Sequence, residues 1–414
     1  MSERDGDDEG AEEGARVRQP LHGLRILDIS TMIAAPVAST LLADFGAEVV
    51  KVELPGVGDT MRQLPPHKDG VPLWWKVTNR NKKGITLDLR QAEGKEIFRR
   101  LLPQFDVLTE NFRPGTLDRY GFPREVLKAL NPKLVILRLT GYGQDGPLAS
   151  RPGFARIAEA YSGFTALCGD PDRPPLHLGY PVADGVAGLF GAIGILIACY
   201  RQKADPQAAG EEIDLSLVDA MIRMLEFSVI EVDQLGTARR RSGNRSQYAG
   251  PSNIYRTLDG RWFSMSASAQ PVFERLARAI GRPELIGHPD FRDNPARVRN
   301  AEALDMIVGG WIAARNEAEV LAVFEREGVS GGPVNDAADV CRSEHLRQRQ
   351  SFVEVEDAEL GRVTMQNVVP KMRHAPGRVA CTGPGLGQHT DEVLSAMAGL
   401  TGEEIARLRS KRVI

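Results

Sequence analysis

The chain has 414 residues, of which 42% are hydrophobic and 26% charged, with a formal net charge of −3. This length exceeds one typical domain, and the composition is that of an ordinary globular protein. No dense cluster of lysine and arginine is interleaved with aromatic residues, which argues against a nucleic-acid partner.

The first 18 residues differ from the rest of the chain. Residues 1–13 hold seven acids and one arginine, a net of −6 that leaves +3 on the remainder. Low hydrophobicity with high charge predicts a disordered acidic tail over 1–18. Acids stand where a signal peptide needs a basic and then an apolar stretch. Four scattered cysteines without a CxxC pair indicate a reduced environment, so we expect a cytoplasmic protein.

From residue 24, short apolar strands alternate with longer amphipathic helices. Strands are predicted at 24–29, 47–53, 84–89, 107–110 and 134–140. Helices are predicted at 36–45, 92–104, 123–130, 185–202 and 216–235. This alternation predicts a Rossmann-like α/β domain with a parallel sheet over residues 19–225.

The pattern changes in the second half of the chain. Residues 255–266 form a predicted hairpin with Asp259-Gly260 at its turn. Helices follow at 270–281, 301–314 and 317–327, which predicts a smaller α+β domain with its linkers over 226–335. Residues 336–414 return to the large domain, with a hairpin around Leu360-Gly361 and a final helix over 402–409.

Asp184 is the first candidate for a catalytic residue. It stands beside Gly185 at the head of an apolar run that continues to Tyr200. This run is shorter than the roughly 20 residues that a bilayer requires, so we expect a buried helix and no membrane association. First-turn N–H groups of that helix would keep the carboxylate ionised, as a nucleophile needs. An N-cap or Asx-turn aspartate is the alternative, and this stretch alone leaves both open.

The segment 141–146 matches the GxGxxG pattern and follows a predicted strand. Pro147 and Pro152 stand where the phosphate-binding helix should begin, and the first βα turn (30–36) contains no glycine. A nicotinamide or flavin oxidoreductase is therefore disfavoured, and these glycines are predicted to shape a loop.

A polar cluster over 110–119 follows the strand at 107–110. Open α/β sheets bind ligands at the carboxyl ends of their strands. Here Asn111 offers a donor and an acceptor, Phe112 a flat face for a purine, and Arg119 a charge for a phosphate. A capped loop would explain the same residues equally well.

Several motifs are missing. The sequence has no Walker loop. It also has no HxH or HExxH pair, so we expect no metal site.

Six ordered segments resemble the class III CoA-transferases, the formyl-CoA transferase-like family, across nearly all of 20–414. They are 20–28 (PLHGLRILD), 42–53 (LADFGAEVVKVE), 79–88 (NRNKKGITLD), 110–115 (ENFRPG), 140–147 (TGYGQDGP) and 386–392 (LGQHTDE). The stretch 151–158 and the ending 409–414 are most similar to succinyl-CoA:dicarboxylate CoA-transferases of bacteria. The resemblance implies two chains interlocked as a dimer.

The resemblance also implies a reaction and its residues. Asp184 aligns with the catalytic aspartate, which carries the acyl group as an anhydride and then CoA as a thioester. The substrates are an acyl-CoA and a small carboxylic acid, and no cofactor is needed because thioester exchange is nearly energy-neutral. The implied CoA-binding residues are Ile33, Ala34, Leu54, Leu87, Arg90, Asn111, Phe112, Arg113, Arg119, Phe154 and Ala155.

The sequence departs from formyl-CoA transferase at two places. That enzyme has an arginine where Leu54 stands, and its glycine-rich flap is not recognisable between 243 and 253. Formate and oxalate are therefore disfavoured as substrates. Arg245 or another arginine nearby is a candidate partner for the distal carboxylate of a dicarboxylic acid. An exposed loop arginine is the alternative interpretation.

Two other functions belong to the same fold. A 2-methylacyl-CoA racemase needs a histidine opposite the aspartate for two-sided proton transfer, and Phe154 occupies that position here. Some relatives are heteromers with one catalytically silent subunit, whereas the intact Asp184 favours an active subunit.

Overall fold

The computed structural model describes residues 19–414, so the predicted acidic tail lies outside the described residues. The chain divides into two compact units. In the described chain the first unit contains 19–158, 181–223 and 350–414, and the second contains 159–180 and 224–349. The second unit thus takes in 159–180, a stretch assigned to the large domain from sequence. The chain returns to the first unit at 350 and not at 336.

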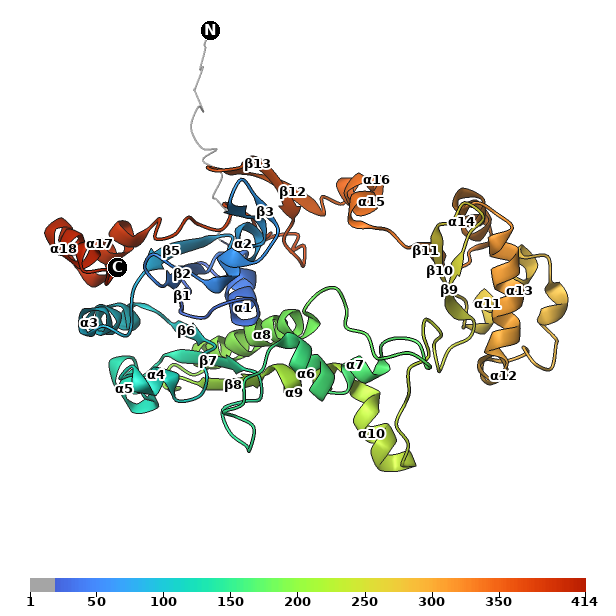
Figure 1. Ribbon diagram of the computed structural model, residues 1–414, viewed down its shortest axis with the longest axis horizontal. Helices are drawn as coiled ribbons and strands as arrows, with labels where there is room; N and C mark the ends of the chain where they lie inside the picture. The colour runs from blue at the N-terminus through green and yellow to red at the C-terminus, as the bar shows by residue number, and fades with distance from the viewer. Residues whose placement is uncertain (1–18) are drawn as a thin grey trace, which may run out of the picture. The chain divides into compact units, whose positions relative to one another are not determined.

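The first unit is built on a six-stranded parallel sheet in the order β5-β2-β1-β6-β7-β8 (Figure 1). Its strands are β1 (Arg25–Asp28), β2 (Glu48–Glu53), β5 (Lys82–Thr86), β6 (Val107–Glu110), β7 (Val135–Thr140) and β8 (Glu212–Ser216). The predicted Rossmann-like α/β class is confirmed. The strand order reverses between β1 and β6, and ligands of open parallel sheets bind beside the carboxyl ends at this switch point.

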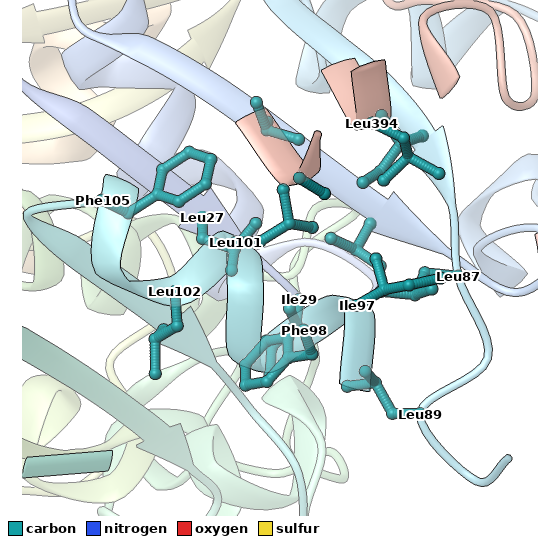
Figure 2. Packing of buried hydrophobic residues seen from close by; sticks show 14 of the residues in the cluster. Leu27, Ile29, Leu87, Leu89, Ile97, Phe98, Leu101, Leu102, Phe105 and Leu394 are labelled. Carbon is teal, nitrogen blue, oxygen red and sulfur yellow. The ribbon is translucent and has the colours of Figure 1, made fainter. Parts of the chain in front are cut away.

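Helices cover both faces of this sheet. Alternate residues of β1 divide between the faces, because strand side chains point to opposite sides. Leu27 and Ile29 join a core with α3 (Ala92–Leu101), α17 (Thr390–Ala398) and α18 (Gly402–Ser410). Figure 2 shows Ile97, Phe98 and Leu101 of α3 in this core with Leu394 of α17. Residues from both ends of the sequence therefore share one core.

The other face carries α1 (Ala34–Ala43) and α8 (Val182–Ala204), which lie side by side in Figure 1. Two glycines of α8 permit this close approach. A Cβ at Gly188 would lie 2.7 Å from Val37 Cγ1 and 3.0 Å from the Ala34 carbonyl oxygen. A Cβ at Gly191 would lie 3.0 Å from Leu137 Cδ2 of β7. The α8 helix is consequently fixed against both α1 and the sheet.

Within residues 19–414, α8 is the one helix whose length and composition would allow it to cross a membrane. It has 23 residues, more than the apolar run predicts, and the prediction of a buried helix is wrong for one of its faces. Its glycine face is covered by α1 and β7, but a stripe of apolar side chains on another face is exposed. This α8 stripe consists of Leu189, Ile193, Leu196, Ile197 and Tyr200.

Shorter elements complete the first unit. They are η1 (Thr60–Gln63), β3 (His67–Lys68), β4 (Val71–Pro72), α2 (Leu73–Thr78), η2 (Leu102–Gln104), α4 (Thr116–Arg119), α5 (Arg124–Leu130), β12 (Phe352–Asp357) and β13 (Gly361–Gln366). Two helices, α6 (Ala155–Tyr161) and α9 (Leu217–Met224), begin in this unit and end in the other. The predicted hairpin around Leu360-Gly361 is confirmed as β12-β13.

The second unit is a smaller α+β structure around a three-stranded sheet. Its strands are β9 (Ser252–Arg256), β10 (Trp262–Ser266) and β11 (Gly331–Pro333), and β9-β10 is the predicted hairpin. Its helical elements are α7 (Phe164–Leu167), α10 (Glu226–Leu235), α11 (Gln270–Ala279), η3 (Pro283–Leu285), α12 (Asn294–Arg299), α13 (Ala301–Ala313), α14 (Glu317–Glu327), α15 (Ala337–Arg342) and α16 (Glu344–Gln348). The helix predicted over 216–235 is interrupted at Leu225 and forms α9 and α10.

We predict that Gly188→Ala lowers the free energy of unfolding by about 1–3 kcal/mol, because the added methyl group meets the α1 backbone. Urea denaturation measures the change. Gly310→Ala is the matched control: nothing lies within 4 Å of a Cβ at this position on α13, so the substitution should stabilise by about 0.5–1 kcal/mol. Equal effects of the two substitutions would contradict the close α1–α8 packing.

Candidate active site

A cavity of about 250 Å³ opens at the carboxyl edge of the sheet, where β1, β6 and β7 end. We call it the Asp184 cavity. Its walls come from four stretches and two single residues of the first unit. They are Thr31, Met32, Ile33 and Ala34; Asn111, Phe112, Arg113 and Pro114; Leu139, Thr140 and Gly141; Ala149, Arg151, Pro152, Gly153 and Phe154; and Asp184 with Leu217.

A second cavity of about 100 Å³, which we call the Leu87 cavity, lies on the β2-β5 side of the same edge. Its walls are Ile29, Thr31, Val52, Glu53, Leu54, Gly58, Asp59, Leu87, Asp88, Leu89, Arg90, Phe112 and Tyr120. The two cavities share Thr31 and Phe112. They are therefore neighbours, separated at the point where the strand order reverses.

Asp184 is the third residue of α8, after the N-cap residue Pro181. The N-cap alternative for Asp184 is therefore wrong. The Asp184 side chain is half-buried in the first turn of α8, a position where the helix dipole favours acidic residues. Because Gly188, one turn later, contacts the first turn of α1, Asp184 lies on the cavity wall together with Ile33 and Ala34.

A buried set of charges lies beneath the turn that follows β1. Lys51 and Lys82 have no exposed side-chain surface, and both lie close to the Asp28 carboxylate, at 3.7 and 2.9 Å. Burial opposes the ionisation of Asp28, but the two ammonium groups and the Ser30 and Ser39 hydroxyls outweigh it and hold the pKa of this carboxyl well below its usual range. Burial lowers the pKa of Lys82 to about 8. Each of these buried charges is compensated by its oppositely charged neighbours, so the loss of one would leave another unpaired in the interior.

Glu110 ends β6 and is buried under the polar loop 111–114. Its carboxylate accepts a hydrogen bond from the Phe112 N–H at 2.7 Å and one from Arg138 at 3.0 Å. Arg138 in turn binds Glu212 of β8. Burial raises the pKa of Glu110 to about 7, against the lowering effect of Arg138 and the Phe112 N–H.

The glycines at 141–146 shape a loop, as the sequence predicted. Gly143 and Gly146 have positive φ angles of 92° and 80°, and the next helix, α6, begins only at Ala155. A Cβ at Gly141 would lie 2.9 Å from the Cα of Gly153. The loop therefore folds back on itself, which brings Arg151 and Phe154 to the wall of the Asp184 cavity.

The structure brings most of the predicted site residues to these two cavities. Ile33, Ala34, Asn111, Phe112, Arg113, Phe154 and Asp184 line the Asp184 cavity, and Leu54, Leu87, Arg90 and Phe112 line the Leu87 cavity. Two residues line neither. Arg119 is exposed on α4, where it donates to the Thr116 hydroxyl, and Ala155 is buried at the start of α6. Among residues 19–414, no group of acids, histidines and cysteines is arranged to hold a metal ion.

Asn111 uses its side chain in a way that the sequence did not predict. Its amide oxygen accepts from the Thr31 N–H at 2.8 Å, and its amide nitrogen donates to the Thr31 carbonyl at 2.7 Å. Sequence reasoning also missed Thr31, Met32 and Arg151 as wall residues. Two signals in the sequence could have found them. Thr31 and Met32 follow the predicted strand 24–29, and Arg151 is the first residue of the segment 151–158.

The chain is similar to known proteins over nearly its whole length. The family profile described as CoA-transferase family III matches residues 21–390. The chain is 41% identical over 400 residues to succinyl-CoA–D-citramalate CoA-transferase of Chloroflexus aurantiacus, covering 96% of this chain and 99% of the relative. It is 40% identical over 406 residues to the beta subunit of succinyl-CoA–L-malate CoA-transferase of the same organism, covering 97% and 100%.

A solved structure of a CaiB/BaiF family protein from Brucella suis is also similar, with 30% identity and a TM-score of 0.82 over 92% of this chain and 100% of that chain. The chain therefore belongs to CoA-transferase family III and is a CoA-transferase. The resemblance recognised in the sequence is confirmed.

We predict that Glu110→Gln removes a pH-dependent part of the folding stability. The folded state raises the pKa of Glu110 from 4.5 to about 7, so it binds the extra proton more tightly than the unfolded chain does. Stability from this group is present below pH 4.5 and is lost as the pH rises through about 7. The amide that replaces the carboxyl in the variant does not titrate. Urea denaturation from about pH 4.5 to 8 should therefore show wild type losing stability relative to the variant.

The exposed Glu125→Gln on α5 serves as the control and should follow the wild-type profile. Parallel profiles for wild type and Glu110→Gln would show that Glu110 does not titrate in this window.

Proposed function

We propose that this CoA-transferase moves CoA from a donor acyl-CoA, with succinyl-CoA as the first candidate, to a small dicarboxylic acid. The observation that carries the proposal is the position of Asp184 in one cavity with residues from the carboxyl ends of β1, β6 and β7. The relatives at 40–41% identity are named for succinyl-CoA and for citramalate or malate, which are hydroxy-dicarboxylic acids, and this supports these substrates.

The proposed chemistry needs no cofactor. The Asp184 carboxylate attacks the carbonyl carbon of the donor thioester, which forms a mixed anhydride and releases the CoA thiolate. The thiolate attacks the aspartyl carbonyl, which gives an aspartyl-CoA thioester and the free donor acid. The acceptor carboxylate then attacks this thioester, and the released thiolate attacks the acceptor acyl carbon. The product acyl-CoA leaves, Asp184 is again a carboxylate, and no net proton is taken up.

Two arginines in the wall of the Asp184 cavity support the proposal that the acceptor acid carries a second carboxylate. Arg113 and Arg151 both line the Asp184 cavity, and neither has a carboxylate partner among the described residues. Arg245, which the sequence offered for this role, is instead bound to Asp305 in the second unit at 2.6 Å. Guanidinium groups bind carboxylates bidentately, so either arginine could recognise the distal carboxylate. Because the resemblance implies that Arg113 binds CoA, we assign this role to Arg151.

The α8 stripe supports the proposal of an interlocked homodimer. Monomeric soluble proteins rarely expose a large contiguous apolar patch, and this stripe extends over about three turns of one helix. The relative named as a beta subunit keeps a heteromer as the alternative assembly. We place the reaction in the cytoplasm, since all four cysteines are free thiols.

A racemase has less support than a transferase. Phe154 lines the cavity and is 68% exposed, but its ring cannot exchange a proton. None of the described residues that line this cavity is a histidine.

We predict that Asp184→Ala and Asp184→Asn reduce transfer by on the order of 10⁴-fold or more, because they remove the proposed nucleophile. Mass spectrometry of succinyl-CoA incubated with an isotopically labelled acid measures labelled acyl-CoA. Asp219→Asn is the control, since Asp219 lies in the first turn of α9 but lines neither cavity. Wild-type protein treated with hydroxylamine during turnover should be modified at Asp184. An unmodified Asp184, or active variants, would exclude the mechanism.

We predict that Arg151→Ala raises the KM for dicarboxylic acceptors by roughly 10- to 100-fold, as expected for a lost charge-assisted pair. The KM for monocarboxylic acceptors of the same length should change less than about twofold, because they lack the second charge. Arg156→Ala, an exposed α6 arginine outside the cavity wall, is the control. If Arg151 instead holds a phosphate of CoA, the KM for acyl-CoA will rise with either acceptor.

A further inference from the structure

The loop 141–154 joins β7 to α6 and carries Arg151 to the wall of the Asp184 cavity. The second arm of this loop, 149–154, supplies most of its wall residues, whereas the first arm, 142–146, does not line the cavity. The whole loop and the strand β8 beside it belong to the first unit. Where Arg151 stands therefore depends on what holds the first arm.

The first arm is held by the end of β8. The Gln144 N–H donates to both carboxylate oxygens of Asp214, at 3.0 and 3.1 Å. One residue earlier, the Gly143 N–H donates to the Thr140 hydroxyl at 2.9 Å. The φ of 92° at Gly143 turns the backbone in a way that glycine permits most easily, and this turn presents the next N–H to Asp214. The loop is thus tied to a neighbouring strand by one carboxylate.

The surroundings of Asp214 show that its charge is directed at the loop. Partial burial raises the pKa of its carboxyl, and the Gln144 N–H opposes this rise. Three acids nearby raise the pKa further, namely Asp145, Asp219 and Glu212. Within residues 19–414, the Gln144 N–H is the donor that binds this carboxylate. A bond from an N–H to an ionised carboxylate is stronger than one to a neutral group. The loop, and not a cation, therefore compensates the charge of Asp214.

A shift of the first arm would reach Arg151, because the two arms of the loop are in contact. A Cβ at Gly141 would lie 2.9 Å from the Cα of Gly153, and a Cβ at Gly153 would lie 3.1 Å from Tyr142 Cε2. The Arg151 N–H donates to the Leu148 carbonyl at 2.8 Å, which closes the turn just before this contact. Closely packed atoms transmit displacements, so the first arm cannot move alone.

We propose that Asp214 is a positioning residue for recognition of the acceptor acid, and that it acts through the Gln144 N–H and the loop on Arg151. The inference rests on the proposed function, in which Arg151 binds the distal carboxylate. Asp214 lies in β8 and lines neither cavity, so its effect on a substrate has to pass through the loop. A bidentate pair between a guanidinium and a carboxylate needs a fixed geometry, which a loosened loop would not provide.

Steady-state kinetics with succinyl-CoA and two kinds of acceptor test this. For Asp214→Ala we expect the KM for dicarboxylic acceptors to rise about tenfold. The KM for monocarboxylic acceptors of the same length should change less than about twofold, because they lack the group that Arg151 binds. The KM for succinyl-CoA should also change less than about twofold, since its implied contacts come mainly from other segments. Asp214→Asn keeps an oxygen that accepts the Gln144 N–H, so it should restore most of the loss.

A double variant tests whether the effect passes through Arg151. In an Arg151→Ala background, Asp214→Ala should raise the KM for dicarboxylic acceptors no further, because the group that it positions is already gone. The control is Asp145→Ala, which removes an acid of the same loop whose side chain takes part in no hydrogen bond described for residues 19–414. This variant should keep the wild-type KM values. An unchanged KM in Asp214→Ala, equal rises for both kinds of acceptor, or additive effects in the double variant would overturn the proposal.

Hydrogen–deuterium exchange tests the same link without turnover. Peptides that cover 142–153 should exchange about tenfold faster in Asp214→Ala than in wild type or Asp145→Ala, because the loop opens more easily once its tie to β8 is lost. Equal exchange in wild type and Asp214→Ala would overturn this inference alone. Wild type that protects the loop but transfers CoA to no dicarboxylic acid would instead refute the proposed function.

Discussion

The geometry of the site depends on a group of charges that have no contact with solvent. Asp28, Lys51 and Lys82 are buried, and Lys51 also lies 3.3 Å from Asp59. A buried charge is costly unless its partners stay in place, so these residues keep one arrangement. That arrangement fixes the backbone of the turn 30–32, because the Lys51 ammonium group donates to the Ser30 carbonyl. The loop after β6 fixes the same turn through Asn111, whose amide binds the Thr31 backbone.

In an open parallel sheet, the reversal of the strand order is enough to create a crevice, which here lies between β1 and β6. In dinucleotide-binding proteins a glycine-rich first turn lets a pyrophosphate approach that crevice. In this protein side chains cross the crevice and join its two walls, so the space is divided into two cavities that meet at Thr31 and Phe112. The first turn of this protein therefore lacks the glycine-rich cradle of a dinucleotide-binding site.

The catalytic candidate reaches this crevice by helix packing. Asp184 lies more than 70 residues beyond Asn111 in the sequence, and the intervening chain passes through the second unit. Close contact of α8 with α1, permitted by Gly188 and Gly191, brings the start of α8 to the end of β1. Small residues at a helix crossing thus have a functional consequence, because they set where the carboxylate stands relative to the turn.

Much of this protein could be predicted from the sequence, because hydrophobic periodicity and ordered motifs report local structure. The alternation of strands and helices predicted the parallel sheet, Pro147 and Pro152 argued against a dinucleotide site, and the segment matches identified the family. Periodicity failed where the pattern is weak: the short, partly polar strand β8 was missed, and the break at Leu225 has no glycine or proline to mark it.

The sequence by itself determined which residues are available for catalysis and which class of sheet they occupy. Tertiary structure alone decided that the Asn111 amide binds Thr31, that Arg245 is engaged by Asp305, and that Arg151 reaches the Asp184 cavity. The physical reason is that a hydrogen bond or an ion pair depends on distance in space, and contacts between segments 60 to 80 residues apart leave no periodic trace in the order of the amino acids.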